Sequence, residues 1–494
     1  MEFLFDDDII DRRDGVRRVL GDVRKDGRSI ISPEMPWESD SLGRASVIFD
    51  REEGIFKIWY RTVAMETAVP DVGGSVPPEG GESSYLCYAE SDDGLNWERR
   101  SLGIHEFRGS SDNNIVMELP PDIDTPFFNI LKDPDDSDEG RRYKAIGFDD
   151  SVTSSLRDRA DGERGVCVSY SPDGFNWEEP ELVMSTDDLT DCDCVLGQRD
   201  PTTGRWVAFF RPRTHPKRRF IAYSESLNFD HWTYPRMLLT PEGEDDRWIE
   251  FYGMTAAVVG RWRVGCLWVM HNNPEHSPMT NELVYSRDGL NYRRAMPRVQ
   301  FLPLGPDGSA DSRMIMPIAL IEREDGCLLY YRGTNQEHGS DRSGDGIGGV
   351  EMPRGRVDGD ERRSILSVAR IEGRNFCGLR AEFDGVVETG FLCNYGDGGV
   401  EAHADAGNDG WIRAEILDQY GRVIPGWDRY HCEVRYSRGR VRFCWGQEEL
   451  VGINGQTSDE GGKVGHVVKL RFYLHKATLY GFQVGKEGSM PPYR

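Results

Sequence analysis

A short motif recurs along the first three quarters of the chain and constrains the fold more than any other feature. Each copy is a run of alternating apolar and polar residues that leads into Asp-Gly, followed three positions later by an aromatic residue. Clear copies lie at residues 88–97, 168–177 and 284–292, a variant without the glycine at 223–232, and a worn copy at 366–376. Asp-Gly supplies the positive-φ position of a tight hairpin turn. Each copy therefore predicts a strand ending in a hairpin, and the copy without glycine predicts a longer turn.

Two further strands, separated by a glycine turn, are predicted upstream of each copy. These strand pairs lie at residues 46–60, 127–146, 192–210, 252–269 and 315–331. Units of about 45 residues with four strands each are typical of propeller blades. No helical periodicity lies between the strands, which argues against an α/β fold. We therefore predict an all-β chain with a five-bladed β-propeller over residues 1–375.

The pattern changes near residue 375. Strictly alternating runs, joined by polar and glycine-rich turns, follow at residues 391–394, 411–417, 440–445, 467–473 and 477–484. Short alternating strands of this kind are typical of a β-sandwich. The second predicted domain is a C-terminal β-sandwich over residues 376–494.

The charge balance limits the partners of the chain. Sixty Lys and Arg residues stand against 85 Asp and Glu residues, a formal net charge of −25. Nucleic acids and anionic membranes require a basic face, so neither is an expected partner. No apolar run is long enough for a membrane span, and the first residues lack the basic-then-apolar order of a signal peptide. We expect a cytoplasmic protein, or a secreted one whose leader was removed; the oligomeric state stays open.

Two motifs that suggest cofactors fail on inspection. Cys192 and Cys194 are separated by one residue and lack the second Cys or His pair of a zinc site. The glycine-rich segment 344–349 lacks the Lys-Ser/Thr that completes a phosphate-binding loop. The sequence therefore predicts neither a metal nor another cofactor.

Acidic residues precede all five expected inner strands. In a propeller these strands line the central channel, and side chains at their entry ends converge at its mouth. Glycoside hydrolysis needs two carboxyl groups beside the scissile bond, one of which donates a proton. We predict Glu250 as the acid, because the flanking rings of Trp248 and Tyr252 would favour its protonated form. Asp193 and Asp311 are the candidates for nucleophile, base or modulator, in an order that the sequence leaves open.

Further side chains near these strand ends are candidates for binding a sugar. The densest basic run, residues 211–219, could clamp a carboxylated or sulfated sugar through a bidentate guanidinium. The alternatives are a solvated hairpin for this run and turn-capping positions for the carboxylates. The predicted substrate-binding residues are Trp37, Glu38, Arg61, Asn114, Asp191, Arg211, Trp248, Tyr252, Arg313, Arg332 and His338.

Several segments together resemble proteins of the glycoside hydrolase family 32 and 43 type. They are residues 36–38, 56–60, 102–104, 109–116, 142–144, 307–314 and 467–482. The resemblance implies a five-bladed propeller, a C-terminal sandwich and glycosidase activity. The chain departs from family 32 in lacking its Trp-x-Asn-Asp-Pro-Asn and Glu-Cys motifs. It does carry Arg-Asp-Pro at residues 199–201, but Asp200 is expected in a turn at the far end of an inner strand.

Two functions follow as hypotheses. The first is a glycosidase that cleaves an oligosaccharide or polysaccharide with carboxylate acid–base chemistry at the propeller mouth. It predicts two or three carboxyl groups within roughly 5–10 Å of one another. The second is a non-catalytic carbohydrate-binding or scaffold propeller, which apolar side chains filling the mouth would favour.

Overall fold

The computed structural model describes most of the chain. The described ranges are residues 1–38, 44–65, 82–119, 129–149, 165–185, 195–212, 218–273, 276–338, 363–393, 399–437, 440–446 and 467–485. Their regular structure consists of strands and one short 3-10 turn, η2 (Glu139–Arg141). This confirms the predicted all-β class. No helix within these ranges is long and apolar enough to cross a membrane.

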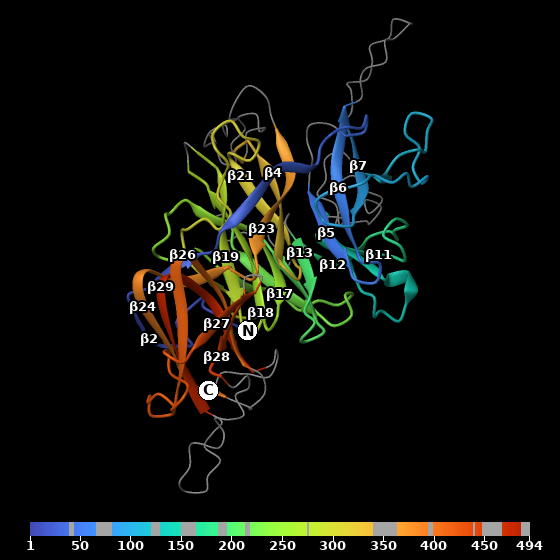
Figure 1. The fold of residues 1–494 in the computed structure, drawn as a ribbon. Helices are drawn as coiled ribbons and strands as arrows, with labels where there is room; N and C mark the ends of the chain where they lie inside the picture. The colour runs from blue at the N-terminus through green and yellow to red at the C-terminus, as the bar shows by residue number, and fades with distance from the viewer. Residues whose placement is uncertain are drawn as a thin grey trace, which may run out of the picture.

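Five units of four strands occupy the chain between residues 23 and 372 (Figure 1). Unit 1 contains β5 (Ala45–Asp50), β6 (Ile55–Met65), β7 (Glu82–Ser91) and β8 (Ile115–Leu119). Unit 2 contains β9 (Asn129–Lys132), β10 (Tyr143–Asp149), β11 (Gly165–Ser171) and β12 (Glu181–Ser185). Unit 3 contains β13 (Val195–Arg199), β14 (Trp206–Phe210), β15 (Ile221–Ser226) and β16 (Arg236–Leu239). Unit 4 contains β17 (Ile249–Val259), β18 (Trp262–His271), β19 (Met279–Ser286) and β20 (Arg293–Arg294).

The fifth unit takes its outermost strand from the beginning of the chain. It contains β21 (Met314–Glu322), β22 (Gly326–Thr334), β23 (Ser364–Glu372) and β4 (Val23–Ile31). β4 pairs with β23, so residues separated by more than 300 positions share one sheet. A single parallel pairing, between Met279 and Met314, also joins units 4 and 5.

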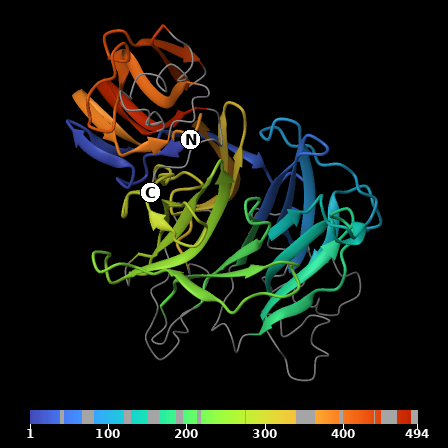
Figure 2. The ribbon, with the colours of Figure 1, turned by 90° about the horizontal axis from the view of Figure 1, so that it is seen from below.

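The first strands of the five units lie next to one another in a ring. β5 lies beside β9, β9 beside β13, β13 beside β17, β17 beside β21, and β21 beside β5. Figure 2 shows the units arranged around this centre. The ring encloses a channel of about 140 Å³ whose lining is largely apolar, for example Val47, Ile130, Leu196, Ala256 and Ile318. The entry ends of these strands are called the mouth below.

The recurring Asp-Gly motif forms the turns after the third strands and fastens one unit to another. Asp93 Oδ1 accepts hydrogen bonds from the backbone N–H groups of Leu95 and Asn96, both at 2.8 Å. Gly94 has φ +76° and lies against unit 5, where the Tyr330 hydroxyl donates to its carbonyl oxygen at 2.8 Å. A Cβ at Gly94 would lie 2.4 Å from that hydroxyl oxygen. Glycine is therefore required here by both conformation and space.

The copy without glycine does not form the longer turn that we predicted. Its turn has the same length as the others, with Asn228 in the place of the aspartate and Phe229 at φ +70° in the place of the glycine. The Phe229 side chain is fully buried against Trp206 and Tyr170, at ring-centroid distances of 5.0 and 6.1 Å. Burial of a phenylalanine gives about 1.5–3 kcal/mol, which offsets the cost of about 1–2 kcal/mol for a left-handed residue.

A nine-stranded sheet completes the chain. Its central order is β2-β24-β29-β26-β28-β27, and β1, β3 and β25 pair along its sides. Its C-terminal strands are β24 (Cys377–Thr389), β25 (Leu392–Cys393), β26 (Val400–Leu417), β27 (Glu433–Ser437), β28 (Arg440–Cys444) and β29 (Val467–Val484). Its N-terminal strands are β1 (Glu2–Phe3), β2 (Ile10–Asp14) and β3 (Arg17–Leu20). The two runs predicted at 467–473 and 477–484 form one continuous strand, β29.

The N-terminal strands thus pair with the C-terminal sheet, whereas we had assigned them to the first domain. The physical reason is apolar burial at the junction. Phe5 is buried between Trp262 and Tyr285 of unit 4, with ring centroids 5.2 and 4.7 Å away, and Phe3 packs against Phe376 at 5.7 Å. A domain boundary near residue 375 stays a prediction.

Candidate functional site

Five side chains from units 3, 4 and 5 meet at the mouth. Arg211 directly follows β14, Arg219 precedes β15, Glu250 and Tyr252 lie on β17, and His338 follows β22. We call this group the Tyr252 cluster. β17 has a bulge between Phe251 and Gly253, so Tyr252 is the extra residue in the strand. A bulge redirects the side chain that it contains, and here it brings Tyr252 to the other four.

Tyr252 is the centre of the cluster. Its hydroxyl oxygen lies 3.0 Å from His338 Nε2, within hydrogen-bond distance. The guanidinium carbon of Arg211 lies 4.2 Å from the centroid of its ring, and that of Arg219 lies 5.4 Å away. Arginine over an aromatic face is attracted by the electron-rich ring. The arrangement concentrates positive charge at the mouth of an otherwise acidic protein.

Glu250 is buried and ion-paired in this cluster. Arg219 Nη1 donates to Glu250 Oε2 at 2.5 Å, and the Asn272 amide donates to Oε1 at 3.2 Å. Hydrogen bonds from a cation favour the ionised carboxylate. The prediction of Glu250 as a proton donor is therefore corrected, because this geometry suits a nucleophile, a base or an electrostatic stabiliser. Trp248 is half-buried with its ring 4.7 Å from the Arg247 guanidinium carbon.

Asp311 has different partners from Glu250. Its carboxylate accepts hydrogen bonds from Lys25 Nζ at 2.7 Å, Ser309 Oγ at 2.8 Å and the Tyr331 hydroxyl at 3.3 Å. Lys25 belongs to β4, the outermost strand of unit 5. The predicted meeting of Asp311 with Glu250 is therefore corrected: Asp311 ties the start of β21 to its own sheet. The next predicted residue, Arg313, lies 3.5 Å from Asp307.

Three predicted sugar-binding residues form a buried network inside unit 1 instead. Trp37 Nε1 donates to Asn114 Oδ1 at 2.8 Å, and Asn114 Nδ2 donates to the Tyr60 hydroxyl at 2.8 Å. Tyr60 in turn donates to Glu38 at 2.5 Å, and Arg99 Nε donates to the same carboxylate at 2.8 Å. These contacts hold residues 32–38 against unit 1, which corrects the expectation that Trp37, Glu38 and Asn114 face a sugar.

The remaining predicted residues divide into two groups. Arg61, on β6, donates from Nε to Ser84 Oγ at 2.8 Å, and Arg332, on β22, lies opposite Met316 of β21. Asp191 and Asp193 lie outside the described residues. The same is true of the strand-entry acids Asp40, Asp122 and Asp124, and of Cys192 and Cys194.

One buried acid at the mouth was absent from the predicted set. Glu337 accepts a hydrogen bond from the Ser277 backbone N–H at 3.1 Å, and His276 Nδ1 lies 3.6 Å from its carboxylate. It connects the segment after β22 to the hairpin between β18 and β19. The prediction considered acids before inner strands, whereas Glu337 follows a second strand; its position next to His338 was the available signal.

Asp200 lies in the turn after β13, away from the mouth, as the sequence indicated. Arg263 donates to its Oδ2 from Nε at 2.8 Å and from Nη2 at 2.5 Å. Burial acts to raise the pKa of Asp200, but the hydrogen bonds from Arg263 keep it below the ordinary carboxyl range. Asp200 thus joins units 3 and 4 at the opposite end from Tyr252.

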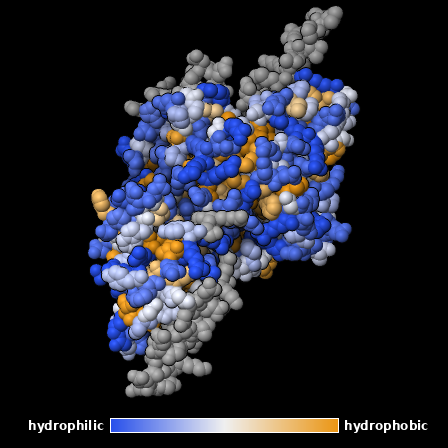
Figure 3. Space-filling view, in the orientation of Figure 1, coloured by the Kyte–Doolittle hydropathy of each residue, from blue (hydrophilic) through white to orange (hydrophobic). Residues whose placement is uncertain are grey.

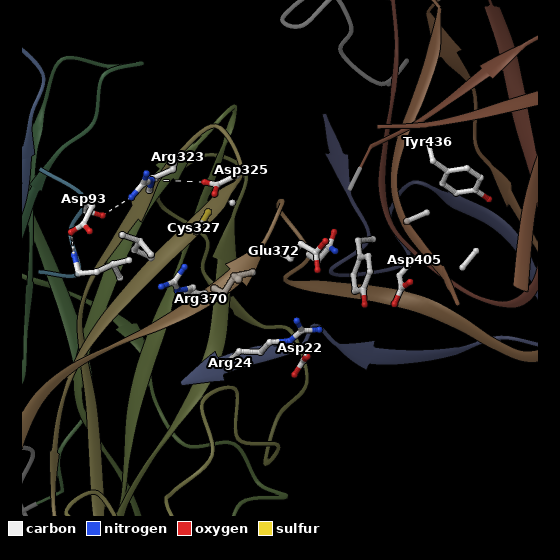
Figure 4. Close-up of a pocket in the computed structure, with 18 residues that line it drawn as sticks. Asp22, Arg24, Asp93, Arg323, Asp325, Cys327, Arg370, Glu372, Asp405 and Tyr436 are labelled. Carbon is white, nitrogen blue, oxygen red and sulfur yellow. Dashed lines mark hydrogen bonds and ion pairs between the residues drawn. The ribbon is translucent and has the colours of Figure 1, made fainter. Parts of the chain in front are cut away.

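A separate groove of about 620 Å³ lies between unit 5 and the C-terminal sheet. Figure 4 shows Arg323 and Asp325 on its unit 5 side, and Asp405 and Tyr436 on the side of the C-terminal sheet. Arg323 Nε lies 3.8 Å from Asp325, and Arg24 Nε donates to Asp22 at 2.7 Å. The groove is at the exit end of β21, so it is distinct from the Tyr252 cluster. Within the described ranges, no group of three or more His, Cys, Asp or Glu side chains could hold a metal ion.

Comparisons with known proteins give similarity of shape. No family model matches the chain, and no curated protein matches it. Similar solved structures include a fructofuranosidase from Schwanniomyces occidentalis complexed with fructosylnystose, with 11% identity, coverage of 94% of this chain and 98% of the other, and a TM-score of 0.43. The family 32 β-fructofuranosidase of Bombyx mori has 11% identity, coverage of 90% and 91%, and a TM-score of 0.41. The β-1,2-mannobiose phosphorylase of Listeria innocua has 12% identity, coverage of 71% and 96%, and a TM-score of 0.43. Because these TM-scores are below 0.5, the function proposed next is argued from the site.

Proposed function

We propose that the chain is a glycoside hydrolase whose five units are the blades of a propeller. The closed ring of inner strands, each followed by three strands of its own sheet, supports this blade count. The apolar core of the nine-stranded sheet supports a sandwich-type domain after residue 375. The active site is the mouth, where blades 3, 4 and 5 place the Tyr252 cluster.

The ion pair between Glu250 and Arg219 is the observation that carries the proposal. A buried carboxylate kept ionised at a concave strand end is suited to act as nucleophile or base on a glycosidic carbon. The complementary proton donor is a second carboxyl group at the same end. Asp193 is the sequence candidate for it, and Glu337 is the nearest additional acid among the described residues.

The chemistry of the cluster indicates the class of sugar. Arg211 and Arg219 both lie over the face of Tyr252, and His338 lies at its hydroxyl. Guanidinium groups bind carboxylates and sulfates with two parallel hydrogen bonds. We therefore propose an oligosaccharide or polysaccharide with a carboxylated or sulfated residue as substrate.

The test is hydrolysis of a panel of aryl glycosides and polysaccharides, both neutral and anionic, read as released reducing ends. Glu250→Gln keeps the size of the side chain and removes its charge. We expect its turnover to fall by at least about 100-fold, the lower range for one acid–base group. Asp311→Asn is the matched control, because Asp311 is also a buried, ion-paired acid but lies elsewhere in blade 5. Equal turnover by wild type and Glu250→Gln would contradict the proposal.

A non-catalytic carbohydrate-binding propeller is the alternative. It is favoured by one observation: the described acids Glu250 and Asp311 are each bound to a cation and share no partner. If the panel gives no reducing ends but an anionic polysaccharide binds, with weaker binding for Arg219→Gln, this alternative replaces the hydrolase.

A further inference from the structure

The outer face of the C-terminal sheet exposes large aromatic rings. Along β26, Ile412, Ala414 and Ile416 are buried in the core of the sheet, so the alternating residues Trp411 and Arg413 face outward. The solvated face of an antiparallel sheet usually carries polar residues. An exposed tryptophan in such a position therefore requires an explanation.

Neighbouring strands hold the Trp411 ring in a fixed orientation. Trp411 lies opposite His475 of β29, and their rings are stacked at 5.7 Å with an interplanar angle of 12°. His475 Nδ1 lies 2.8 Å from Asp384 Oδ1 on β24, within hydrogen-bond distance. Three adjacent strands thus contribute to one supported ring that is still 40% exposed.

A second aromatic pair lies beside the first. The guanidinium carbon of Arg429 lies 4.9 Å from the Tyr430 ring centroid and 4.4 Å from that of Tyr473. Arg429 Nη2 also donates to the Tyr430 hydroxyl at 2.8 Å, while Tyr430 remains 74% exposed. Together with Trp411 and Arg413 these residues line a hollow of about 740 Å³, called the Trp411 hollow.

The next row of the sheet anchors this surface. Arg471 is hydrogen-bonded to Glu388 at 2.9 Å and to Glu415 at 2.8 Å, and the Tyr473 hydroxyl donates to Glu415 at 2.8 Å. This network fixes the Tyr473 ring through its hydroxyl. The Trp411 hollow is therefore preorganised, which lowers the entropic cost of binding a ligand.

Exposed aromatics are concentrated on this part of the protein. Among the described residues, the exposed aromatic side chains after residue 376 are Phe383, Phe391, Trp411, Tyr420, Tyr430 and Tyr436; those before it are Phe49 and Tyr234. Figure 3 shows a surface that is otherwise mostly hydrophilic. The rim carries both signs of charge, with Asp14 and Asp384 beside Arg413 and Arg429. Such a rim does not favour a polyanion, and the net charge of −25 argues further against nucleic acid.

We propose that the Trp411 hollow binds a neutral glycan chain, separately from the mouth. The apolar face of a sugar ring stacks on an aromatic side chain, and its hydroxyls hydrogen-bond to polar groups of either sign at the rim. The volume is within the range of about 300–1,000 Å³ that is usual for small-molecule sites. The role rests on the proposed function in one respect: the hollow would hold neutral stretches of the polymer that the mouth cleaves.

The test uses the full-length protein in native gels that contain starch, xylan, galactomannan or levan. We expect at least one polysaccharide to retard the wild type, and Trp411→Ala and Tyr430→Ala each to weaken that binding at least tenfold. Trp411→Phe, which keeps a ring, should restore much of it. Tyr234→Ala is the matched control, since Tyr234 is 69% exposed on unit 3, and it should migrate like wild type. No retardation of the wild type, or equal retardation of Trp411→Ala, would overturn the proposal.

Two further measurements separate this inference from the hydrolase proposal. Trp411→Ala should cleave a soluble aryl glycoside at the wild-type rate, and Glu250→Gln should keep polysaccharide retention while losing turnover. Retention lost in Trp411→Ala when the wild type has no hydrolytic activity would uphold the hollow and reject the hydrolase. A change of oligomeric state in Trp411→Ala, with retention unchanged, would instead assign the hollow to contact between protein molecules.

Discussion

The charge of Glu250 depends on side chains that reach it from other elements. Arg219 lies before β15 and Asn272 follows β18, yet both donate to this one carboxylate. A strand-entry acid therefore acquires its chemical role from the loops around it. Asp311 is also at a strand entry, but Lys25 and Tyr331 bind it from the sheet of unit 5. Equivalent positions in the repeat thus differ in chemistry.

Tyr252 gives a prediction at the same scale. Tyr252→Phe removes the hydroxyl next to His338 and keeps the ring beneath the two arginines. A neutral hydrogen bond contributes about 1 kcal/mol, so we expect KM to rise about fivefold with kcat nearly unchanged. Tyr252→Ala also removes the cation–π contacts, worth about 0.5–2 kcal/mol each, and should raise KM further.

Steady-state kinetics on the substrate identified by the panel measures both variants, with Tyr223→Phe as a control on the same type of residue in unit 3. A wild-type KM for Tyr252→Ala would exclude Tyr252 from the binding site.

At the scale of elements, the Asp-Gly turns depend on ionised aspartates. Burial acts to raise the pKa of Asp93, but hydrogen bonds from the Asn96 and Leu95 backbone N–H groups and from the Asn96 amide lower it to about 2. A lowered folded-state pKa means that the stabilisation is complete above the unfolded value of about 4 and is lost as the pH falls through 2. We expect Asp93→Asn to be less stable than wild type at pH 6, with a difference that shrinks between pH 4 and pH 2.

Urea denaturation followed by tryptophan fluorescence at pH 6, 4, 3 and 2 measures this difference. Asp92→Asn is the neighbouring control, because Asp92 lies outside the turn's hydrogen bonds described for Asp93. A difference between wild type and Asp93→Asn that stays constant down to pH 2 would contradict the assignment.

The same turns explain which parts of the fold could be predicted. Alternation and Asp-Gly spacing are local properties, so they indicated the strands of the units and the all-β class. The strand β24 was missed because its alternation is interrupted near Ala381–Asp384, where its register against β29 shifts. The turn at Phe229 was predicted wrongly because its left-handed conformation is stabilised by Trp206 and Tyr170, which are distant in sequence.

The candidate site was less predictable than the fold for a related reason. The sequence places acids before inner strands, but it does not specify which partners surround them. The bulge that brings Tyr252 to Arg211 exists only in the paired sheet. The network of Trp37, Glu38 and Asn114 likewise joins residues up to 77 positions apart, so its internal role could not be read from local spacing.

At the scale of the whole molecule, the first residues of the chain connect its two parts. β1 and β2 belong to the C-terminal sheet, whereas β4 completes unit 5. Between them the buried rings of Phe3 and Phe5 contact unit 4 and Phe376. The orientation of the Trp411 hollow relative to the mouth is therefore determined by a small apolar junction, visible where the blue N-terminal strands meet the orange sheet in Figure 2.

This junction yields the last prediction. Phe5 is 1% exposed and lies against Trp262, Tyr285 and Phe376. Phe5→Ala should cost about 3–5 kcal/mol through lost burial and the cavity that remains. Because that loss falls between the two parts, differential scanning calorimetry should resolve two transitions where the wild type has one. Tyr234→Ala, an exposed ring on unit 3, should leave the thermogram unchanged. A single transition at the wild-type temperature for Phe5→Ala would show that the C-terminal sheet is held to unit 4 by other contacts.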